Sequence, residues 1–293
     1  MRVLVFGKQF KEKDQVFVQE LLDGLVAESI DISIYTPYLS DINQRVRIPA
    51  GVDTFDSHAE FLLQRIDFLI VLGGDGTMLA AVTLVRDAGV PMLGINLGRM
   101  GFLATIDKTF VRDAIRKLVS NQFLIVERSM IYLESNPPLF GEMPFALNDC
   151  TLLKRDTSSM ITIHTYINGD YLNSYWADGI IISTPTGSTG YSLSCGGPVI
   201  FPDSRNFVIT PVAPHNLNVR PIVICDASVV SFEIEGRAEN FICTLDSRFE
   251  LIGTHHQIAI RKNNFSTKLV QLQDITFLNT IREKLGWGED IRN

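Results

Sequence analysis

The hydrophobic positions in the first 122 residues alternate between short apolar runs and segments with helical spacing. Short, mostly apolar runs are typical of parallel strands covered on both faces, and they occupy residues 3–6, 32–35, 68–72 and 91–95. Apolar residues recur at helical spacing in residues 16–30, 59–65, 78–85 and 111–119. The alternation of the two patterns predicts an α/β layer with a parallel sheet.

The hydrophobic period changes near residue 123, where short strand-like runs replace helical spacing. These runs predict strands at residues 131–133, 161–167, 180–182, 208–212, 222–224, 229–234, 241–245 and 257–261. Turn sequences such as Asn168-Gly169 and Glu235-Gly236 separate the runs. A helical pattern returns only at residues 277–285. This part of the chain predicts an antiparallel β domain built from two packed sheets.

Together these patterns predict the fold class α/β plus β. A Rossmann-like α/β domain is expected over residues 1–122, and an antiparallel β-sandwich domain over residues 123–272. Residues 273–293 are expected to form a C-terminal helix that packs back on the N-terminal domain. The join near Asn121 lacks the composition of a flexible linker.

Composition narrows the class of protein. The 293 residues are 46% hydrophobic and carry a formal net charge of −7, so the basic footprint of a nucleic-acid-binding protein is missing. The four cysteines are widely spaced without a Cys-x-x-Cys pair, which favours reduced thiols in the cytoplasm and argues against a zinc site. The N-terminus has the pattern of a strand and not of a signal peptide. We therefore expect a cytoplasmic protein that binds neither nucleic acid nor membrane.

One long uncharged stretch follows Asp178 and reaches Pro202. It is dense in small polar residues, which are Ser183, Thr184, Thr186, Gly187, Ser188, Thr189, Gly190, Ser192, Ser194, Gly196 and Gly197. Its glycine, proline and hydroxyl content rules out a membrane span, and a disordered linker would carry more charge. We predict a strand that opens into a tight turn, whose backbone N–H groups and hydroxyls face a polar ligand. A Gly/Ser-rich surface turn is the weaker alternative.

The segment Gly73-Gly74-Asp75-Gly76-Thr77 follows a predicted strand and opens a predicted helix. It matches neither the GxGxxG dinucleotide fingerprint nor the GxxxxGK[ST] phosphate loop. Its glycines would let a phosphate approach the backbone at the helix N-terminus, and a carboxylate can accept a proton or hold Mg²⁺. A tight turn with Asp75 as the N-cap residue explains the same residues equally well.

Other acidic and amide side chains stand next to apolar runs. Asn148-Asp149 interrupts such a run, Asp178 precedes one and Asp246 follows one. An asparagine can pair with an adenine edge and a carboxylate with a ribose diol, but adjacent Asn and Asp also form Asx turns. Taken alone, Asp178 predicts a hairpin turn and Asp246 a turn residue. Neither the histidines nor the serines have the partners of a hydrolase triad.

In combination, these segments resemble the NAD kinases. The segments that carry the resemblance are Gly73-Gly-Asp-Gly-Thr77, Asn96-Leu-Gly-x-x-Gly-Phe-Leu103, Asn148-Asp149, the stretch from Asp178 to Pro198, Pro211-Val-Ala-Pro-His-x-Leu-x-x-Arg-Pro-Ile222 and Asp246. The first of them is shared with diacylglycerol, sphingosine and 6-phosphofructo-kinases, whereas the stretch after Asp178 is specific. The resemblance extends from Val3 to the last predicted helix.

The resemblance implies transfer of the γ-phosphoryl group of ATP to the 2′-hydroxyl of the adenosine ribose of NAD, giving NADP. It implies that Asp75 contacts this hydroxyl as a general base or orienting group. ATP phosphates would lie at Gly73, Gly74, Gly76 and Thr77. NAD would be bound by Gly74, Asp75, Gly76, Asn148, Asp149, Asp178, Thr186, Thr189, Gly190, Tyr191, Ser194 and Asp246.

The resemblance also implies a role for each NAD-binding residue. Asn148 and Thr189 would read the adenine, and Asp149 the other ribose. Asp178, with the backbone at Gly190, would hold the nicotinamide carboxamide. The rest of the pocket would be formed by Thr186, Tyr191, Ser194 and Asp246. The family usually has a glutamate where this chain has Asp149, so the reach of that carboxylate is shorter.

The implied cofactor is Mg²⁺ or another divalent cation, carried mainly on the ATP phosphates and not by protein side chains. The implied partners are NAD, ATP and further copies of the chain, in a homodimer or homotetramer formed through the β domain. The alternatives are a non-catalytic dinucleotide sensor and a lipid kinase with the same Gly-rich turn. The hydroxyl-rich stretch argues against an apolar lipid acceptor. The sequence leaves open whether polyphosphate replaces ATP and whether NADH is accepted.

Overall fold

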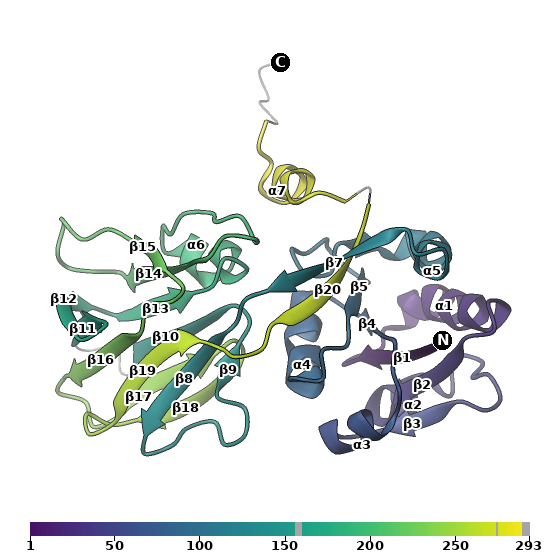
Figure 1. Cartoon of the computed structure of the whole chain (residues 1–293), viewed down its shortest axis with the longest axis horizontal. Coiled ribbons are helices and arrows are strands. Elements are labelled where there is room, and N and C mark those ends of the chain that lie inside the picture. Colours follow the sequence, from purple (N-terminus) through teal and green to yellow (C-terminus); the bar gives the residue numbers. More distant parts are fainter. Residues whose placement is uncertain (156–159, 274, 289–293) are drawn as a thin grey trace. The chain divides into compact units, whose positions relative to one another are not determined.

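The computed structural model describes residues 1–155, 160–273 and 275–288, and the chain folds into two compact units. The first unit consists of residues 1–127 and 267–293, and the second of residues 128–266. Both ends of the chain therefore belong to the first unit (Figure 1).

The first unit is built on an eight-stranded sheet. Its strands, in spatial order, are β3 (Asp53–Phe55), β2 (Asp31–Tyr35), β1 (Arg2–Gly7), β4 (Phe68–Leu72), β5 (Met92–Asn96), β20 (Thr267–Leu272) and β7 (Phe123–Arg128), with β6 (Ile106–Asp107) paired to β5. The pairings from β3 to β20 are parallel. The strand order reverses between β1 and β4, and ligands of such sheets bind outside the carboxyl ends of the strands at this point.

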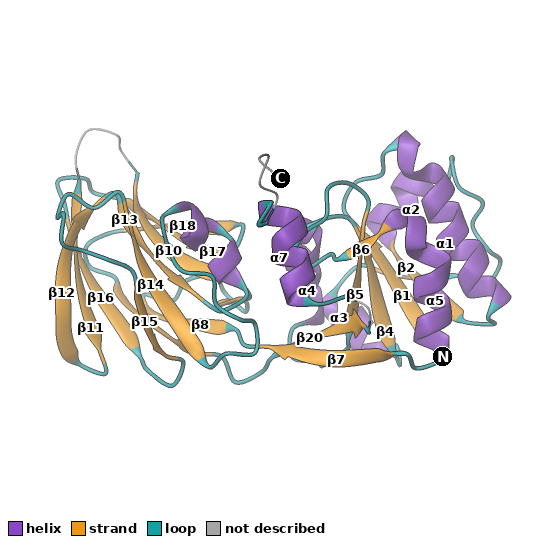
Figure 2. Cartoon of the chain, turned by 90° about the horizontal axis from the view of Figure 1, so that it is seen from above, coloured by secondary structure: helices purple, strands orange, loops and turns teal. Residues whose placement is uncertain are grey.

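The helices of the first unit are α1 (Gln15–Ala27), α2 (Thr36–Ile42), α3 (His58–Leu63), α4 (Asp75–Val85), α5 (Val111–Val119) and α7 (Phe277–Leu285). Figure 2 shows α1, α2 and α5 on one side of the sheet and α4 on the other. In α1 the buried residues Val18, Leu21, Leu22 and Leu25 follow helical spacing, as predicted. Strand β4 is buried along Leu69–Leu72 because helices cover both faces of the sheet.

The second unit consists of two six-stranded sheets with antiparallel pairing. The first of them has the order β15 (Ile222–Cys225), β14 (Asn206–Val212), β13 (Gly179–Ser183), β10 (Asp149–Lys154), β17 (Phe241–Leu245) and β18 (Arg248–Ile252). The other has the order β12 (Asp170–Ala177), β11 (Ile161–Ile167), β16 (Val230–Glu235), β19 (Gln257–Lys262), β8 (Ile131–Asn136) and β9 (Phe145–Ala146). One apolar core takes side chains from both sheets, including Leu152, Ile163 and Ile180. The short helix α6 (Tyr191–Ser194) lies after β13.

The predicted combination of a parallel α/β unit with antiparallel β sheets is confirmed. Several elements were not predicted from the pattern, among them α2, β10, β12 and β18. Pro37 occupies the first turn of α2, where its missing N–H costs no hydrogen bond. Asp178 does not form a hairpin turn, because β12 and β13 belong to different sheets.

The unit boundaries differ from the expected ones at residues 122 and 272. The structure places them at 127/128 and 266/267, because β7 and β20 pair with each other in the sheet of the first unit. These two strands lie far apart in sequence, and their local pattern resembles that of the strands in the β domain. Among the helices that the structure describes, none is long and apolar enough to cross a membrane.

Candidate active site

The Gly-rich turn of the first unit connects β4 to α4. Gly73 has a φ of +155°, and a Cβ atom there would lie 2.2 Å from Oγ1 of Thr77, so the fold itself requires glycine at this position. At Gly74 and Gly76 a Cβ atom would meet no protein atom within 4 Å. The fold therefore gives no steric reason for these two glycines. They leave space above the N-terminus of α4, where backbone N–H groups can bind an anion.

Asp75 is the first residue of α4, and Gly74 is its N-cap residue. The reading of Asp75 as the N-cap was therefore wrong. Its carboxylate accepts three backbone hydrogen bonds, from Phe102 N–H to Oδ2 at 2.8 Å and from Leu103 and Ala104 N–H to Oδ1 at 2.9 and 3.0 Å. A carboxylate offers about four lone-pair positions. The remaining one lies on Oδ2, where Asp75 can still accept a proton or bind a hydroxyl.

Gly101 lies against this carboxylate. A Cβ atom at position 101 would be 1.9 Å from Oδ1 of Asp75, closer than any real contact. The loop is shaped by Asn96, whose Oδ1 accepts a hydrogen bond from Gly98 N–H at 2.7 Å and whose Nδ2 donates to the carbonyl of Arg99. The Asn-Leu-Gly-x-x-Gly segment therefore shapes the loop that leads to residues 102–104, whose backbone N–H groups bind Asp75.

In the second unit, Asp246 forms a similar set of bonds. Its carboxylate accepts hydrogen bonds from three consecutive backbone N–H groups, those of Leu147 at 3.0 Å, Asn148 at 2.7 Å and Asp149 at 3.3 Å. The N–H of Asp246 donates in return to the carbonyl of Asp149 at 3.0 Å. Asp246 has a φ of +54°, a conformation that aspartate adopts more readily than most residues. Its contacts fix the backbone that presents Asn148 and Asp149.

Asp149 begins β10 and is 7% exposed. Asn148-Asp149 thus leads into a strand. Burial, and secondly the negative charge of Asp246, raise the pKa of Asp149 to about 7. The side-chain Oδ1 of the neighbouring Asn148 is buried without a hydrogen-bond partner among the described residues. Buried acceptors are rarely left unpaired, so this atom points to a missing donor.

Asp178 precedes β13 and forms an ion pair with Lys154, whose Nζ lies 2.5 Å from Oδ1 of Asp178. The two residues are also joined through the backbone, because Lys154 N–H donates to the carbonyl of Asp178 at 2.9 Å. Both side chains are partly exposed, 21% for Lys154 and 37% for Asp178. The pair holds Asp178 at one end of β10 while Asp149 stands at the other end of the same strand.

The hydroxyl-rich stretch after β13 uses one group of side chains to hold its own shape. Thr184 Oγ1 donates to the carbonyl of Leu147 at 2.6 Å, Ser188 Oγ donates to Pro185 O at 2.7 Å, and the hydroxyls of Ser192 and Thr210 lie 2.8 Å apart. Gly187 is required here, because a Cβ atom would lie 2.0 Å from the carbonyl oxygen of Asn148.

A second group of hydroxyls in this stretch is not used in that way. The hydroxyl oxygens of Ser183 and Thr186 are buried without a partner among the described residues. The residues Tyr191 and Ser194 of α6 are exposed. Thr189 belongs with the first group instead, since its hydroxyl donates to the carbonyl of Thr186 at 3.1 Å. A Cβ atom at Gly190 would lie 3.9 Å from Oδ2 of Asp149, so this backbone runs close to the Asn148-Asp149 pair.

The predicted site residues therefore form two groups, each within one unit. The first unit brings together Gly73, Gly74, Asp75, Gly76 and Thr77. The second brings Asn148, Asp149, Asp246 and the 186–194 segment together around the start of β10 and the end of β13, whereas Asp178 lies at the other end of these two strands, beside Lys154. Sequence reasoning did not assign roles to Gly101, to the N–H groups of residues 102–104 or to Lys154. Gly101, Phe102 and Leu103 had a local signal, as part of the segment Asn96-Leu-Gly-x-x-Gly-Phe-Leu103.

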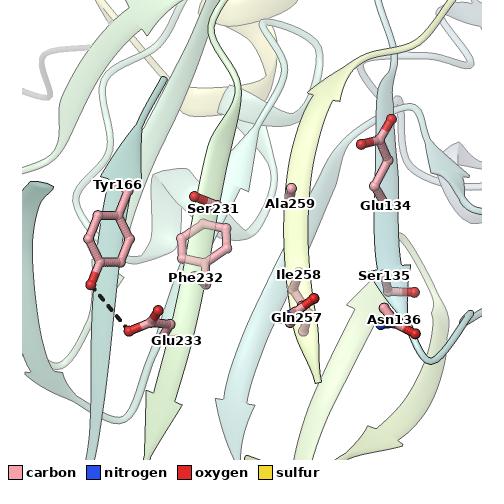
Figure 3. Close-up of a pocket in the computed structure, with 10 residues that line it drawn as sticks. All are labelled: Glu134, Ser135, Asn136, Tyr166, Ser231, Phe232, Glu233, Gln257, Ile258 and Ala259. Atoms are coloured by element: carbon pink, nitrogen blue, oxygen red, sulfur yellow. Dashed lines mark hydrogen bonds between the residues drawn. The ribbon is translucent and has the colours of Figure 1, made fainter. Parts of the chain in front are cut away.

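A cavity of about 420 Å³ lies elsewhere, on the sheet that contains β8, β11, β16 and β19. Figure 3 shows the side chains that line it, among them Tyr166, Glu134 and Glu233, with the Tyr166 hydroxyl 3.2 Å from Glu233. None of the predicted site residues lines it. Residues 1–155, 160–273 and 275–288 also contain no group of three His, Cys, Asp or Glu side chains that could hold a metal ion.

Comparison with known proteins gives concordant results for both parts of the chain. Residues 15–123 match the family model described as the ATP-NAD kinase N-terminal domain, and residues 147–272 match that of the ATP-NAD kinase C-terminal domain. The chain is 46% identical to the NAD kinase of Cytophaga hutchinsonii over 290 residues, covering 98% of both chains. It is 42% identical to the NAD kinase of Flavobacterium psychrophilum over 100% of both chains.

Solved structures support the fold. Yeast NADH kinase complexed with NADH aligns with a TM-score of 0.87 at 22% identity, covering 100% of this chain and 89% of that chain. An NAD kinase from Archaeoglobus fulgidus in complex with ATP aligns with a TM-score of 0.74 at 22% identity, covering 97% and 99% of the two chains. The two matched domains and the full-length relatives lead to one conclusion: the chain belongs to the NAD kinase family.

Proposed function

We propose a residue-level account of how this chain carries out the reaction of its family. As an ATP-dependent NAD kinase, it transfers the γ-phosphoryl group of ATP to the 2′-hydroxyl of the adenosine ribose of NAD. Phosphoryl transfer of this kind depends mainly on positioning the reactants and neutralising charge. The residues that matter are therefore those that hold NAD, those that hold the phosphates and the one that accepts the proton.

Residues of the second unit bind NAD in this proposal. Asn148 pairs with the adenine edge, since its unpaired Oδ1 can accept from the exocyclic amine while Nδ2 donates to a ring nitrogen. Thr189 assists at the adenine. Asp149 in its ionised form accepts hydrogen bonds from the hydroxyls of the other ribose. Asp178, held by Lys154, and the backbone of Gly190 bind the nicotinamide carboxamide.

The rest of the pocket is formed by Thr186, whose buried Oγ1 lacks a partner among the described residues, and by the exposed residues Tyr191 and Ser194. Tyr191 packs on a ring of the dinucleotide. The carboxylate of Asp246 serves the pocket through the backbone of Asn148 and Asp149, whose N–H groups it accepts.

Asp75 acts on the attacking hydroxyl. The 2′-oxygen forms a bond to the γ-phosphorus, the bond between that phosphorus and the β–γ bridging oxygen breaks, and ADP leaves. The proton of the 2′-hydroxyl passes to Oδ2 of Asp75, the oxygen with a free lone-pair position. The three backbone N–H groups of residues 102–104 keep the carboxylate in one orientation throughout.

The phosphates of ATP bind at the Gly-rich turn, where Gly74 and Gly76 leave the backbone accessible and Gly73 and Thr77 shape the start of α4. With a net charge of −7 the chain as a whole does not offset the charge of the phosphates. We therefore assign charge neutralisation to a divalent cation, Mg²⁺ or another, carried by the phosphates. Chelation by EDTA is expected to abolish the activity, and added Mg²⁺ to restore it.

The observation that carries this account is the Asp75 carboxylate with one free lone-pair position beside an open Gly-rich turn. Its test is NADP formation from NAD and Mg·ATP by the wild type and by Asp75→Asn, with NAD binding measured separately by calorimetry. We expect the variant to bind NAD and to form no NADP. A wild type that binds NAD yet forms no NADP would indicate a dinucleotide sensor, and an active Asp75→Asn would remove Asp75 from the chemistry.

We also propose that the enzyme works in the cytoplasm as a homodimer or homotetramer formed through the β unit. All four cysteines are free, which suits a reducing compartment. The exposed side chains of Phe249 and Leu251 on the edge strand β18 give this unit apolar surface for such an interface. Light scattering coupled to size-exclusion chromatography measures the assembly directly. A monomer at micromolar concentration would contradict it.

A further inference from the structure

The C-terminal helix α7 contacts the loop that surrounds Asp75. The ammonium group of Lys284, in the last turn of α7, donates a hydrogen bond to the backbone carbonyl of Met100. The ring of Phe277, the first residue of α7, lies 6.4 Å from the ring of Phe102, measured between centroids. The two ends of one helix thus reach two residues of one loop.

Met100 and Phe102 are the neighbours of Gly101 in sequence. At position 101 there is no room for a side chain, because a Cβ atom would clash with the Asp75 carboxylate. Phe102 also provides the N–H that donates to Oδ2 of Asp75 at 2.8 Å, the same oxygen that has a free lone-pair position. The contacts of α7 therefore fall on the part of the loop whose displacement would move Asp75 most directly.

Helix α7 is itself firmly defined. Thr276 is its N-cap residue and accepts a hydrogen bond from Asn279 N–H at 3.2 Å, and the helix ends at Gly286 with a φ of +65°. Ile281 is 3% exposed, so one face of the helix is buried. The connection from β20 is held as well, because Gln271 Nε2 donates to the carbonyl of Ile275 at 2.6 Å.

We propose that α7 is a positioning element for the catalytic carboxylate, acting through Lys284 and Phe277 on the loop that binds Asp75. The proposal rests on the role assigned to Asp75 above. Neither side chain touches the reacting atoms. Lys284 fixes the carbonyl on one side of Gly101 and Phe277 packs against the side chain on the other, so that the N–H groups of residues 102–104 keep their direction toward Asp75.

A positioning role makes predictions that a purely structural role does not. Loosening the loop should lower kcat, because a misplacement of about 1 Å can cost on the order of 100-fold in rate. The affinity for NAD, which we assign to the second unit, should stay unchanged. The backbone N–H groups of residues 102–104 should exchange with solvent faster, because their bonds to Asp75 would open more often.

The experiment compares Lys284→Met, Phe277→Ala and the double variant with the wild type. Arg282→Met is the matched control, since Arg282 is a cation of the same helix whose hydrogen bonds stay within it, to Leu278 O and Asn279 Oδ1. Lys284→Arg is the conservative variant that should restore the bond to Met100. For the double variant we expect kcat to fall by roughly tenfold or more, with an unchanged Kd for NAD by calorimetry.

Hydrogen–deuterium exchange of the 96–104 segment gives a readout that does not depend on activity. We expect faster exchange in Lys284→Met and in the double variant, and wild-type exchange in Arg282→Met and Lys284→Arg. Unchanged exchange, an unchanged kcat or an equal loss in Arg282→Met would overturn the proposal. If the wild type itself forms no NADP, the proposed function fails, and the exchange data still decide whether α7 holds the loop.

Discussion

A methyl group on residue 101 would lie 1.9 Å from Oδ1 of Asp75. Gly101→Ala must therefore displace either the loop or the carboxylate. We expect kcat to fall on the order of 100-fold, since reacting groups tolerate little misplacement, while the far-UV circular dichroism stays that of the wild type. Gly98→Ala is the matched control in the same loop, because its Cβ would meet only Asn96 Oδ1 at 3.8 Å, an ordinary contact. Equal losses in the two variants would refute this steric explanation.

Asp246→Ala removes the acceptor of three backbone hydrogen bonds. A buried donor left without a partner costs about 1–3 kcal/mol, and alanine at a φ of +54° adds strain. We expect the free energy of unfolding to fall by about 2 kcal/mol or more and the Kd for NAD to rise. Urea denaturation and calorimetry measure the two quantities. The exposed neighbour Ser247 provides the control variant Ser247→Ala. Wild-type stability of Asp246→Ala would show that the bonds are dispensable.

The pKa of Asp149, raised to about 7 by burial and by Asp246, predicts a pH-dependent affinity for NAD. The ionised carboxylate offers both of its oxygens to the two ribose hydroxyls, whereas protonation turns one of them into a donor. Its ionised fraction rises from about one tenth at pH 6 to about nine tenths at pH 8, so the KM for NAD should fall on the order of tenfold over this range. Steady-state kinetics from pH 6 to 8 measure the profile. Asp149→Asn should flatten it, and an unaltered profile in that variant would assign the titration to another group.

Ionisation of Asp149 lowers the stability of the fold, whereas it improves the binding of NAD. Because the pKa of Asp149 is higher in the folded protein than its ordinary value of 3.8, folding favours the protonated form. Its stabilising contribution is complete below about pH 4 and is lost as the pH rises through about 7. The contribution of this residue to unfolding free energy should therefore decrease over the range in which binding of NAD improves. The difference between wild type and Asp149→Asn, measured by denaturation at several pH values, isolates it.

Lys154→Met should weaken binding of NAD without altering the chemical step. The variant removes the cation 2.5 Å from Asp178, and partly exposed ion pairs contribute about 1 kcal/mol, or roughly fivefold in KM. Lys154→Arg should restore most of the affinity. Lys262→Met breaks another ion pair of the same unit, that with Asp226, and serves as the control. If both methionine variants raise KM alike, the effect is one of general stability and not of Asp178.

Elements with strong local patterns could be predicted from the sequence. The helix expected at residues 111–119 and the strand expected at residues 68–72 have those bounds in the structure, because one is strongly amphipathic and the other uniformly apolar. Strand β10 was not predicted, because its first residue, Asp149, looked like part of an Asx turn. Its polar start is accommodated by Asp246, 97 positions further along the chain.

The partners of the site residues were beyond the reach of local patterns. The flanking glycines indicated a functional role for Asp75, but the hydrogen-bond donors to the Asp75 carboxylate lie 27 to 29 positions away in the sequence. Lys284, at 184 positions from Met100, is more distant still. Periodicity reports only which face of an element is buried. It does not report which backbone N–H groups of another loop will meet a given carboxylate.

The place of β20 in the first sheet has a consequence for the order in which the protein is made. β20 lies between β5 and β7, although residues 128–266 of the second unit are translated before it. On the ribosome, the second unit can fold before Leu269 of β20 has been synthesised and can pair with Met92 of β5. During that interval an unpaired strand edge is open to pairing with another chain. The unit that emerges first is therefore completed last.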